Sequence, residues 1–201
     1  MAKNAHSELV RVLSESGEAL LDLGLESEIV KAIPVVNLAA ALMKEASNIR
    51  DKGLISKLSR FLNEPRLQRT LESEAMREKL LKDEYAELIG ERLFLVIEKF
   101  SDLQKPVLLA RVFAAYLNDE LSRADFFLLA HAIDVAYIRD LERFLDAKAL
   151  IEGLEPPEIQ RLTNAGLCMT FSSGALGGGG LQYHPAPIAQ ILYNAVAIIV
   201  E

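Results

Sequence analysis

Three groups of residues in this sequence could carry chemistry: a histidine–aspartate pair, a cysteine with a distant histidine, and a run of glycines. His131 and Asp134 are three residues apart, so they share one face of a helix, as two metal ligands would. A metal site needs three or four ligands, and the other histidines are distant in sequence. His131 also lies within the apolar run FFLLAHAIDVAY. We therefore predict a core histidine that is hydrogen-bonded to Asp134 or to the backbone.

Cys168 and His184 are predicted to lie on two neighbouring strands, where they could form a nucleophile–base pair. No acidic residue stands nearby to orient the histidine, since Asp, Glu, Lys and Arg are all absent from Leu162 to Val200. We therefore predict that Cys168 is a small buried hydrophobic residue. It is the only cysteine and forms no internal disulfide, which agrees with a reducing compartment.

The glycine-rich stretch GALGGGG, residues 174–180, is the third group. Backbone N–H groups of such loops can hold phosphate, but this stretch lacks the Lys and Ser/Thr of a P-loop. It also lies between two predicted strands rather than before a helix, so we predict the tip of a β-hairpin. Because none of the three groups completes a catalytic pattern, the sequence predicts a protein that is not an enzyme and that has no metal or cofactor.

Most of the 201-residue chain is predicted to be helical, because helix formers dominate and Gly and Pro lie at plausible boundaries. Hydrophobic residues make up 51% and charged residues 25%, the balance of a folded globular protein. Pro34 is expected to kink or restart its helix, and Ser122 with Asp125 resembles a capping box. The helices predicted before residue 150 cover residues 7–22, 26–53, 54–63, 68–99 (as one or two helices), 106–118, 123–137 and 139–149.

The composition changes at Gly153, after which the predicted order is helix, strand, glycine-rich loop, strand and helix. The segments RLTNAGLCMTF and LQYHPAPIAQILYNA resemble the corresponding part of the winged-helix family, whose members usually bind DNA. The residues that carry this resemblance are Leu162, Gly166, Leu167, Tyr183, Pro187, Ile188 and Leu192. We predict a mainly α fold, with a helical bundle over residues 1–152 and a small winged-helix-like α+β unit over residues 153–201 that ends in an apolar helix, 188–200.

The charge of the chain argues against DNA binding by this unit. The whole protein has a net charge of −7, and residues 101–201 carry seven basic and twelve acidic side chains, a net charge of −5. Phosphate contacts supply much of the affinity for DNA, and this half has few cations to make them. If the protein is a regulator, the candidate DNA contacts are Gln160, Arg161 and Asn164. The candidate wing and dimer contacts are Gly177, Gly178, Gly179, Gly180, Tyr183, Ile188, Ile191 and Leu192.

An apolar segment, Ile29–Met43, precedes a basic one, Lys44–Arg69, which has seven basic and three acidic side chains and a net charge of +4. This combination is typical of elements that lie on a membrane surface. The alternative, which we favour, is close helix packing through small residues such as Ala39, Ala40 and Ala41. The candidate partner or membrane contacts are Ile29, Val30, Ile33, Val35, Val36, Leu38, Lys52, Lys57 and Arg60.

The stretch AIPVVNLAAALMKEASNIRDKGLISKLSRFLNE, followed by ERLFLVIEKFSDLQKPVLLARVFAAYL, resembles a family of helical bacterial proteins of abortive infection, of the "alpha" type. The resemblance covers about residues 29–150. It is carried by the word Ile33-Pro34-Val35-Val36, the basic helix Ile55–Leu62, and the pattern Glu98-Lys99…Asp102…Lys105. It implies a role in bacterial or phage defence and assigns no role to any single residue.

Together these observations lead us to expect a non-enzymatic interaction protein of bacterial or phage defence. It would act through apolar helices and oligomer contacts, with a protein partner or a second copy of itself. The alternatives are a winged-helix DNA-binding transcriptional regulator and a membrane-surface effector. The start, MAKNAHSELV, lacks the order of a signal peptide, so the expected location is the cytoplasm, with a peripheral position at the inner membrane as the alternative.

Overall fold

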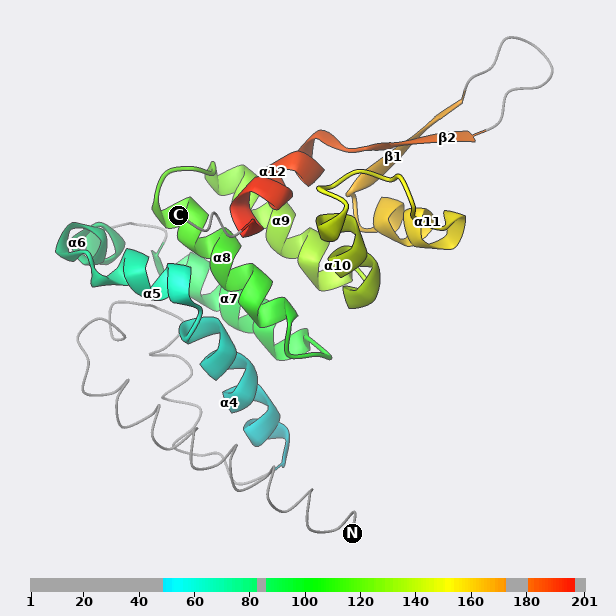
Figure 1. Ribbon diagram of the computed structural model, residues 1–201. Helices are drawn as coiled ribbons and strands as arrows, with labels where there is room; N and C mark the ends of the chain where they lie inside the picture. Colours follow the sequence, from blue (N-terminus) through cyan, green and yellow to red (C-terminus); the bar gives the residue numbers. More distant parts are fainter. Residues whose placement is uncertain (1–48, 83–85, 173–180, 198–201) are drawn as a thin grey trace. The chain divides into compact units, whose positions relative to one another are not determined.

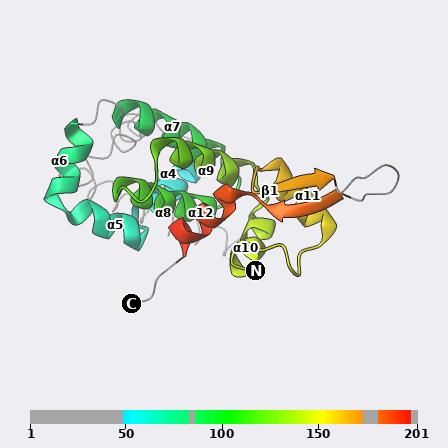
Figure 2. The same ribbon diagram turned by 90° about the horizontal axis from the view of Figure 1, so that it is seen from above.

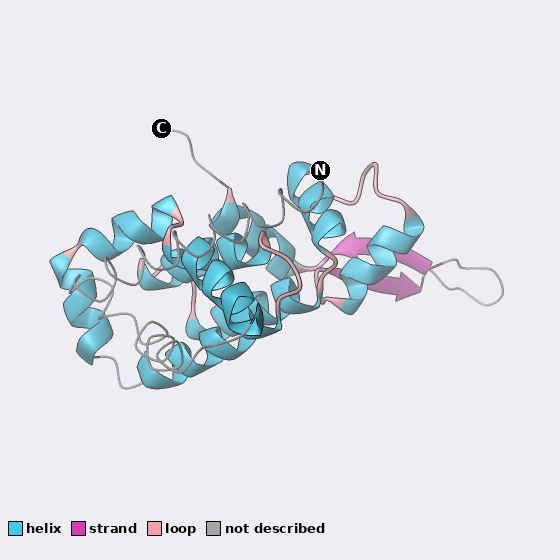
Figure 3. Cartoon of the chain, turned by 90° about the horizontal axis from the view of Figure 1, so that it is seen from below, coloured by secondary structure: helices cyan, strands magenta, loops and turns pink. Residues whose placement is uncertain are grey.

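A computed structural model describes residues 49–82, 86–172 and 181–197, and its helices and strands carry the labels of Figure 1. Within these ranges the chain forms nine α-helices and one two-stranded antiparallel sheet, and Figure 3 shows how far helix predominates. The predicted mainly α class with a small α+β part is therefore confirmed. The helix predicted over residues 7–22, and most of that over 26–53, lie outside the described residues.

The chain divides into two compact units, Met1–Ala110 and Arg111–Glu201, and each is treated by itself. The boundary that the sequence predicts after residue 152 stays a prediction. The described helices of the first unit are α4 (Ile49–Leu62), α5 (Pro65–Glu72), α6 (Glu74–Lys82), α7 (Ala86–Lys99) and the first turns of α8 (Lys105–Leu117).

The sequence predicted one or two helices over residues 68–99, and the structure has three. The first of them begins earlier, at Pro65, because the Glu64 carboxylate accepts hydrogen bonds from the backbone N–H groups of Arg66 (2.8 Å) and Leu67 (3.0 Å). It ends at Ser73, whose backbone is extended (φ −70°, ψ 121°). The prediction was wrong because the charged residues on both sides of Ser73 favour helix equally well and conceal the break.

The first unit is held together by apolar side chains on three helices. Each helix presents a stripe at helical spacing, so its buried side chains point into one shared interior. These buried side chains are Leu58 and Phe61 on α4, Leu67 and Leu71 on α5, and Ile89, Leu93 and Ile97 on α7.

The second unit contains the end of α8, α9 (Arg123–Val135), α10 (Ile138–Asp146), α11 (Pro156–Asn164), β1 (Cys168–Ser172), β2 (Leu181–Pro185) and α12 (Pro187–Val196). Three aromatic rings pack at the α8–α9 contact, since the Phe126 centroid lies 5.7 Å from that of Phe113 and 5.1 Å from that of Tyr116. The predicted cap of α9 is confirmed, because Ser122 Oγ accepts a hydrogen bond from the Asp125 N–H (3.1 Å).

The hairpin follows α11 directly. Strands β1 and β2 are antiparallel, with Thr170 opposite Tyr183 and Phe171 opposite Gln182. Figure 2 shows them side by side, and the sheet of the described chain has no third strand. Because side chains alternate along a strand, Thr170 and Tyr183 share one face of the hairpin and Phe171 and Gln182 the other.

Three helices of this unit end in the same way, with a residue of positive φ that closes the last turn. These residues are Asp119 after α8 (φ 60°), Lys148 after α10 (φ 58°) and Gly166 after α11 (φ 79°). In each case the next N–H bonds back to a carbonyl five residues earlier, as Ala149 does to Phe144 (2.9 Å). Only one of the three positions is a glycine, so the other two carry backbone strain.

Candidate interaction surface

The side chain of Arg161 on α11 is held by α10. Its Nε donates to Asp140 Oδ2 (2.5 Å) and its Nη2 donates to Asp140 Oδ1 (2.9 Å), the two-pronged pairing that suits guanidinium and carboxylate. Asp140 is only 2% exposed, so this carboxylate depends on its partner. The hydrogen bond to Asp140 raises the pKa of the Arg161 guanidinium above its ordinary value. Tyr137 adds a cation–π contact, with its ring centroid 5.8 Å from Arg161 Cζ.

The two polar neighbours of Arg161 are also engaged. The hydroxyl of Tyr183 on β2 donates to Gln160 Oε1 (3.0 Å), and Gln160 Nε2 lies 3.4 Å from Asn164 Oδ1, to which it donates. Gln160, Arg161 and Asn164 are the candidate DNA contacts of the winged-helix interpretation. The structure brings them together on α11, and each is bonded within the chain.

A second arginine, Arg143, holds the start of α11 through hydrogen bonds. Arg143 on α10 donates to Glu158 Oε1 and, through Nη2, to the carbonyl of Gly153 (2.8 Å). Glu158 Oε2 in turn accepts from the backbone N–H of Glu155 (2.7 Å), so its two oxygens tie the helix start to α10. Arg143 and Arg161 thus stabilise the packing of α10 against α11.

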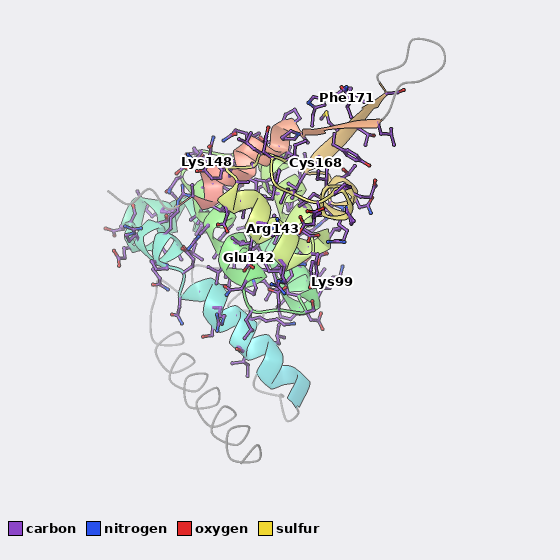
Figure 4. The ribbon with its side chains drawn as sticks, turned by 45° about the vertical axis from the view of Figure 1, so that its right-hand side comes forward. Lys99, Glu142, Arg143, Lys148, Cys168 and Phe171 are labelled. Atoms are coloured by element: carbon purple, nitrogen blue, oxygen red, sulfur yellow. The ribbon has the colours of Figure 1, made fainter. Side chains whose placement is uncertain are left out.

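The hairpin presents apolar side chains to solvent. Phe171 is 51% exposed and Leu181 is 66% exposed, on strands that contain no Asp, Glu, Lys or Arg. The Phe171 ring meets His184 edge-on, with centroids 5.4 Å apart. Figure 4 shows Cys168 at the inner end of β1 and Phe171 towards its outer end. Neither Phe171 nor Leu181 was among the predicted sites, although alternation along LCMTFSS puts Phe171 on the face opposite the buried Cys168.

The predicted wing and dimer contacts have several environments. Tyr183, Ile188 and Ile191 are half-buried, whereas Leu192 is fully buried in the core of the second unit. The helix α12 is therefore not uniformly covered: one side packs inward, and Arg111 Nη1 donates to the Val196 carbonyl at its end (3.2 Å). Gly177, Gly178, Gly179 and Gly180 lie outside the described residues.

The residues singled out for chemistry are not brought together. Cys168 is buried as predicted, and this burial raises the pKa of its thiol to about 11. His184 is exposed and pairs with Met169, so its side chain lies on the face opposite Cys168. The prediction of a core histidine was wrong, because His131 is exposed on α9 while Leu129, Ala130 and Ile133 are buried. Among the described residues, no group of three His, Cys, Asp or Glu could hold a metal ion.

The predicted membrane contacts can be followed only in part. Lys57 on α4 donates from Nζ to the carbonyl of Glu98 (2.8 Å) at the end of α7, and its partial burial lowers the pKa of the ammonium group. Arg60 is exposed, and Lys52 belongs to α4. In the part of the chain that the structure describes, no helix has the length and apolarity to cross a membrane. Ile29, Val30, Ile33, Val35, Val36 and Leu38 lie outside that part.

In comparisons with known proteins, no family model, no curated protein and no solved structure matches this chain.

Proposed function

We propose that this is a non-enzymatic interaction protein that contacts another protein through the β1–β2 hairpin that follows α11. The observation that carries the proposal is the pairing of Arg161 with buried Asp140, because it offsets the charge of the one cation of α11 and commits two of its N–H donors within the chain. The exposed Phe171 and Leu181 add to it, since they place large apolar side chains on both faces of an uncharged strand pair, a composition typical of protein contacts.

The winged-helix regulator is the weaker alternative. It would have to contact DNA with three side chains that already bond within the chain, namely Gln160, Arg161 and Asn164. It would also need cations to neutralise phosphates, whereas residues 101–201 have a net charge of −5.

The cellular part of the proposal rests on the resemblance of residues 29–150 to abortive-infection proteins. It assigns the protein to bacterial or phage defence in the cytoplasm. The test compares phage plating on bacteria with and without the gene, and with a variant gene encoding Phe171→Ser. We expect fewer plaques with the unaltered gene and full plating with the variant. Equal plating on all three strains would remove defence from the proposal and leave the interaction untouched.

The interaction itself is tested with a photo-cross-linking amino acid at position 171, and at the exposed position 142 of α10 as the control. Both are introduced in cells that produce the full chain. We expect protease-sensitive adducts from position 171 in clear excess over position 142. Nuclease-sensitive adducts, or equal yields at the two positions, would contradict the proposal. In parallel, binding to a mixed-sequence duplex is followed by fluorescence anisotropy at two salt concentrations, where we expect no salt-sensitive binding.

A further inference from the structure

The outer edge of β1 is open for pairing in the described chain, because the sheet consists of β1 and β2 alone. Each strand of a two-stranded hairpin has one edge whose backbone N–H and C=O groups find no partner in the sheet. Such edges pair readily with another strand unless charges, prolines or bulges prevent it, and a two-stranded hairpin by itself is only marginally stable.

The hydrogen bonds at the base of the hairpin tell which groups face outward. The Ala186 N–H donates to the Leu167 carbonyl (2.9 Å), directly before the pair Cys168–Pro185. Hydrogen-bonded and non-hydrogen-bonded pairs alternate in an antiparallel ladder. The backbone groups of Thr170 and Ser172 on β1 therefore point away from β2, as do those of Leu181, Tyr183 and Pro185 on β2.

The two edges differ in their readiness to pair. On β2, Pro185 has no N–H to offer outward, and Tyr183 is tied through its hydroxyl to Gln160. On β1, the run Thr170–Ser172 is exposed, contains no proline and carries no ionised side chain. This exposed run is centred on Phe171. The outer edge of β1 therefore has no feature that would prevent another strand from pairing with it.

We propose that β1 pairs antiparallel with β1 of a second copy of this chain, with the two-fold axis at Phe171. This proposal deepens the proposed function and rests on it. Thr170 of each copy then lies opposite Ser172 of the other, and the outward backbone groups of these residues exchange hydrogen bonds. Phe171 faces Phe171 of the second copy as a non-hydrogen-bonded pair, the type in which side chains come closest. Aromatic pairs at such positions stabilise antiparallel strands.

The charge of the molecule limits where a second copy can bind. Two copies with a net charge of −7 each repel each other, and like charges directly opposite each other destabilise a strand pair. Between two β1 strands no charged side chains meet, because residues 168–172 contain none. The same contact covers the half-exposed Phe171 of both copies.

The register is tested by disulfide trapping of the full chain in a Cys168→Ala background. One sample carries Thr170→Cys, a second carries Ser172→Cys, and a third is their equimolar mixture. We expect the mixture to form a covalent dimer under mild oxidation, because Cα atoms of a hydrogen-bonded pair lie about 5.5 Å apart, within disulfide range. Each variant alone should cross-link far less. Equal cross-linking in all three samples would contradict this register.

The strength of the contact is tested by sedimentation velocity on Phe171→Ser, with Leu128→Ser, at a similarly exposed position on α9 outside the hairpin, as the matched control. We expect the wild type and Leu128→Ser to dimerise alike. Phe171→Ser should raise the dimer dissociation constant at least about tenfold, because both copies lose a buried aromatic ring. Circular dichroism verifies that each variant is folded.

Two outcomes separate this inference from the proposed function. A chain that stays monomeric at every concentration, yet is photo-cross-linked from position 171 to a different protein, overturns the dimer and leaves the interaction function standing. Nuclease-sensitive adducts from position 171 overturn the proposed function itself, whatever the mass of the protein.

Discussion

Arg161 and Asp140 lie 21 residues apart in sequence and are joined by two hydrogen bonds between α11 and α10. The carboxylate is buried, whereas about half of the guanidinium side chain reaches solvent. The two residues therefore depend on each other to different degrees. If Arg161 is lost, a charge is left in the interior. If Asp140 is lost, the arginine can turn to water. Because helix α11 carries the hairpin at its end, this pair also positions the proposed interaction surface.

The first prediction follows from that inequality. Arg161→Met should lower the thermal midpoint of unfolding more than Asp140→Asn, because it leaves a buried carboxylate without a partner. Arg139→Met, at an exposed position of α10, serves as the control and should have little effect. The measurement is thermal unfolding by circular dichroism at neutral pH. A larger loss for Asp140→Asn than for Arg161→Met would show that the guanidinium is the dependent member.

The second prediction concerns the strained backbone at the end of α10. Lys148→Gly should raise the free energy of unfolding by about 1 kcal/mol, because glycine adopts positive φ without the steric cost of a Cβ atom. Asp119→Gly, after α8, is the matched comparison and should gain less, since aspartate tolerates this conformation better than lysine. Urea denaturation of both variants checks the order. Lys148→Gly would contradict the account of strain if it were less stable than the wild type.

A third prediction uses the buried thiol of Cys168. Its pKa is about 11 in the folded protein against an ordinary 9.0, so the unfolded chain loses this proton first as the pH rises. The contribution of Cys168 to stability should therefore fall between about pH 9 and pH 11 and stay constant below. Unfolding of wild type and Cys168→Ala is compared across this range. Parallel curves for the two proteins would mean that the thiol is not shielded.

The fourth prediction concerns the cap of α7 by Lys57. Lys57→Ala should cost about 1 kcal/mol in the free energy of unfolding, because a partly exposed ammonium–carbonyl hydrogen bond is lost. Arg60→Ala, one turn further along α4 and exposed, should cost less than half as much. Denaturant unfolding of both variants provides the comparison. Similar costs for the two would mean that the Lys57 bond contributes nothing specific.

Local chemistry allowed much of the fold to be predicted from the sequence. Ser122 as a cap, proline at the starts of α8, α11 and α12, and Gly166 at the end of α11 act within one helical turn. The glycine run between two short strand-like segments likewise indicated the hairpin, whose strands β1 and β2 lie where they were expected. The break at Ser73 escaped because no proline or glycine marks it.

Which side chains are engaged and which are free was decided by tertiary structure alone. His131 lies in an apolar run, and no pattern in α9 indicates which side of the helix is covered, so its exposure could not be inferred. From the sequence alone, Arg161 is a cation on a possible recognition helix, with no visible partner. In the structure, Asp140 of α10 pairs with it. Caps and turns depend on neighbours within a few residues, which a sequence displays. Pairing and burial depend on residues that folding brings together from far along the chain. The sequence contains these residues but does not show which of them will be in contact.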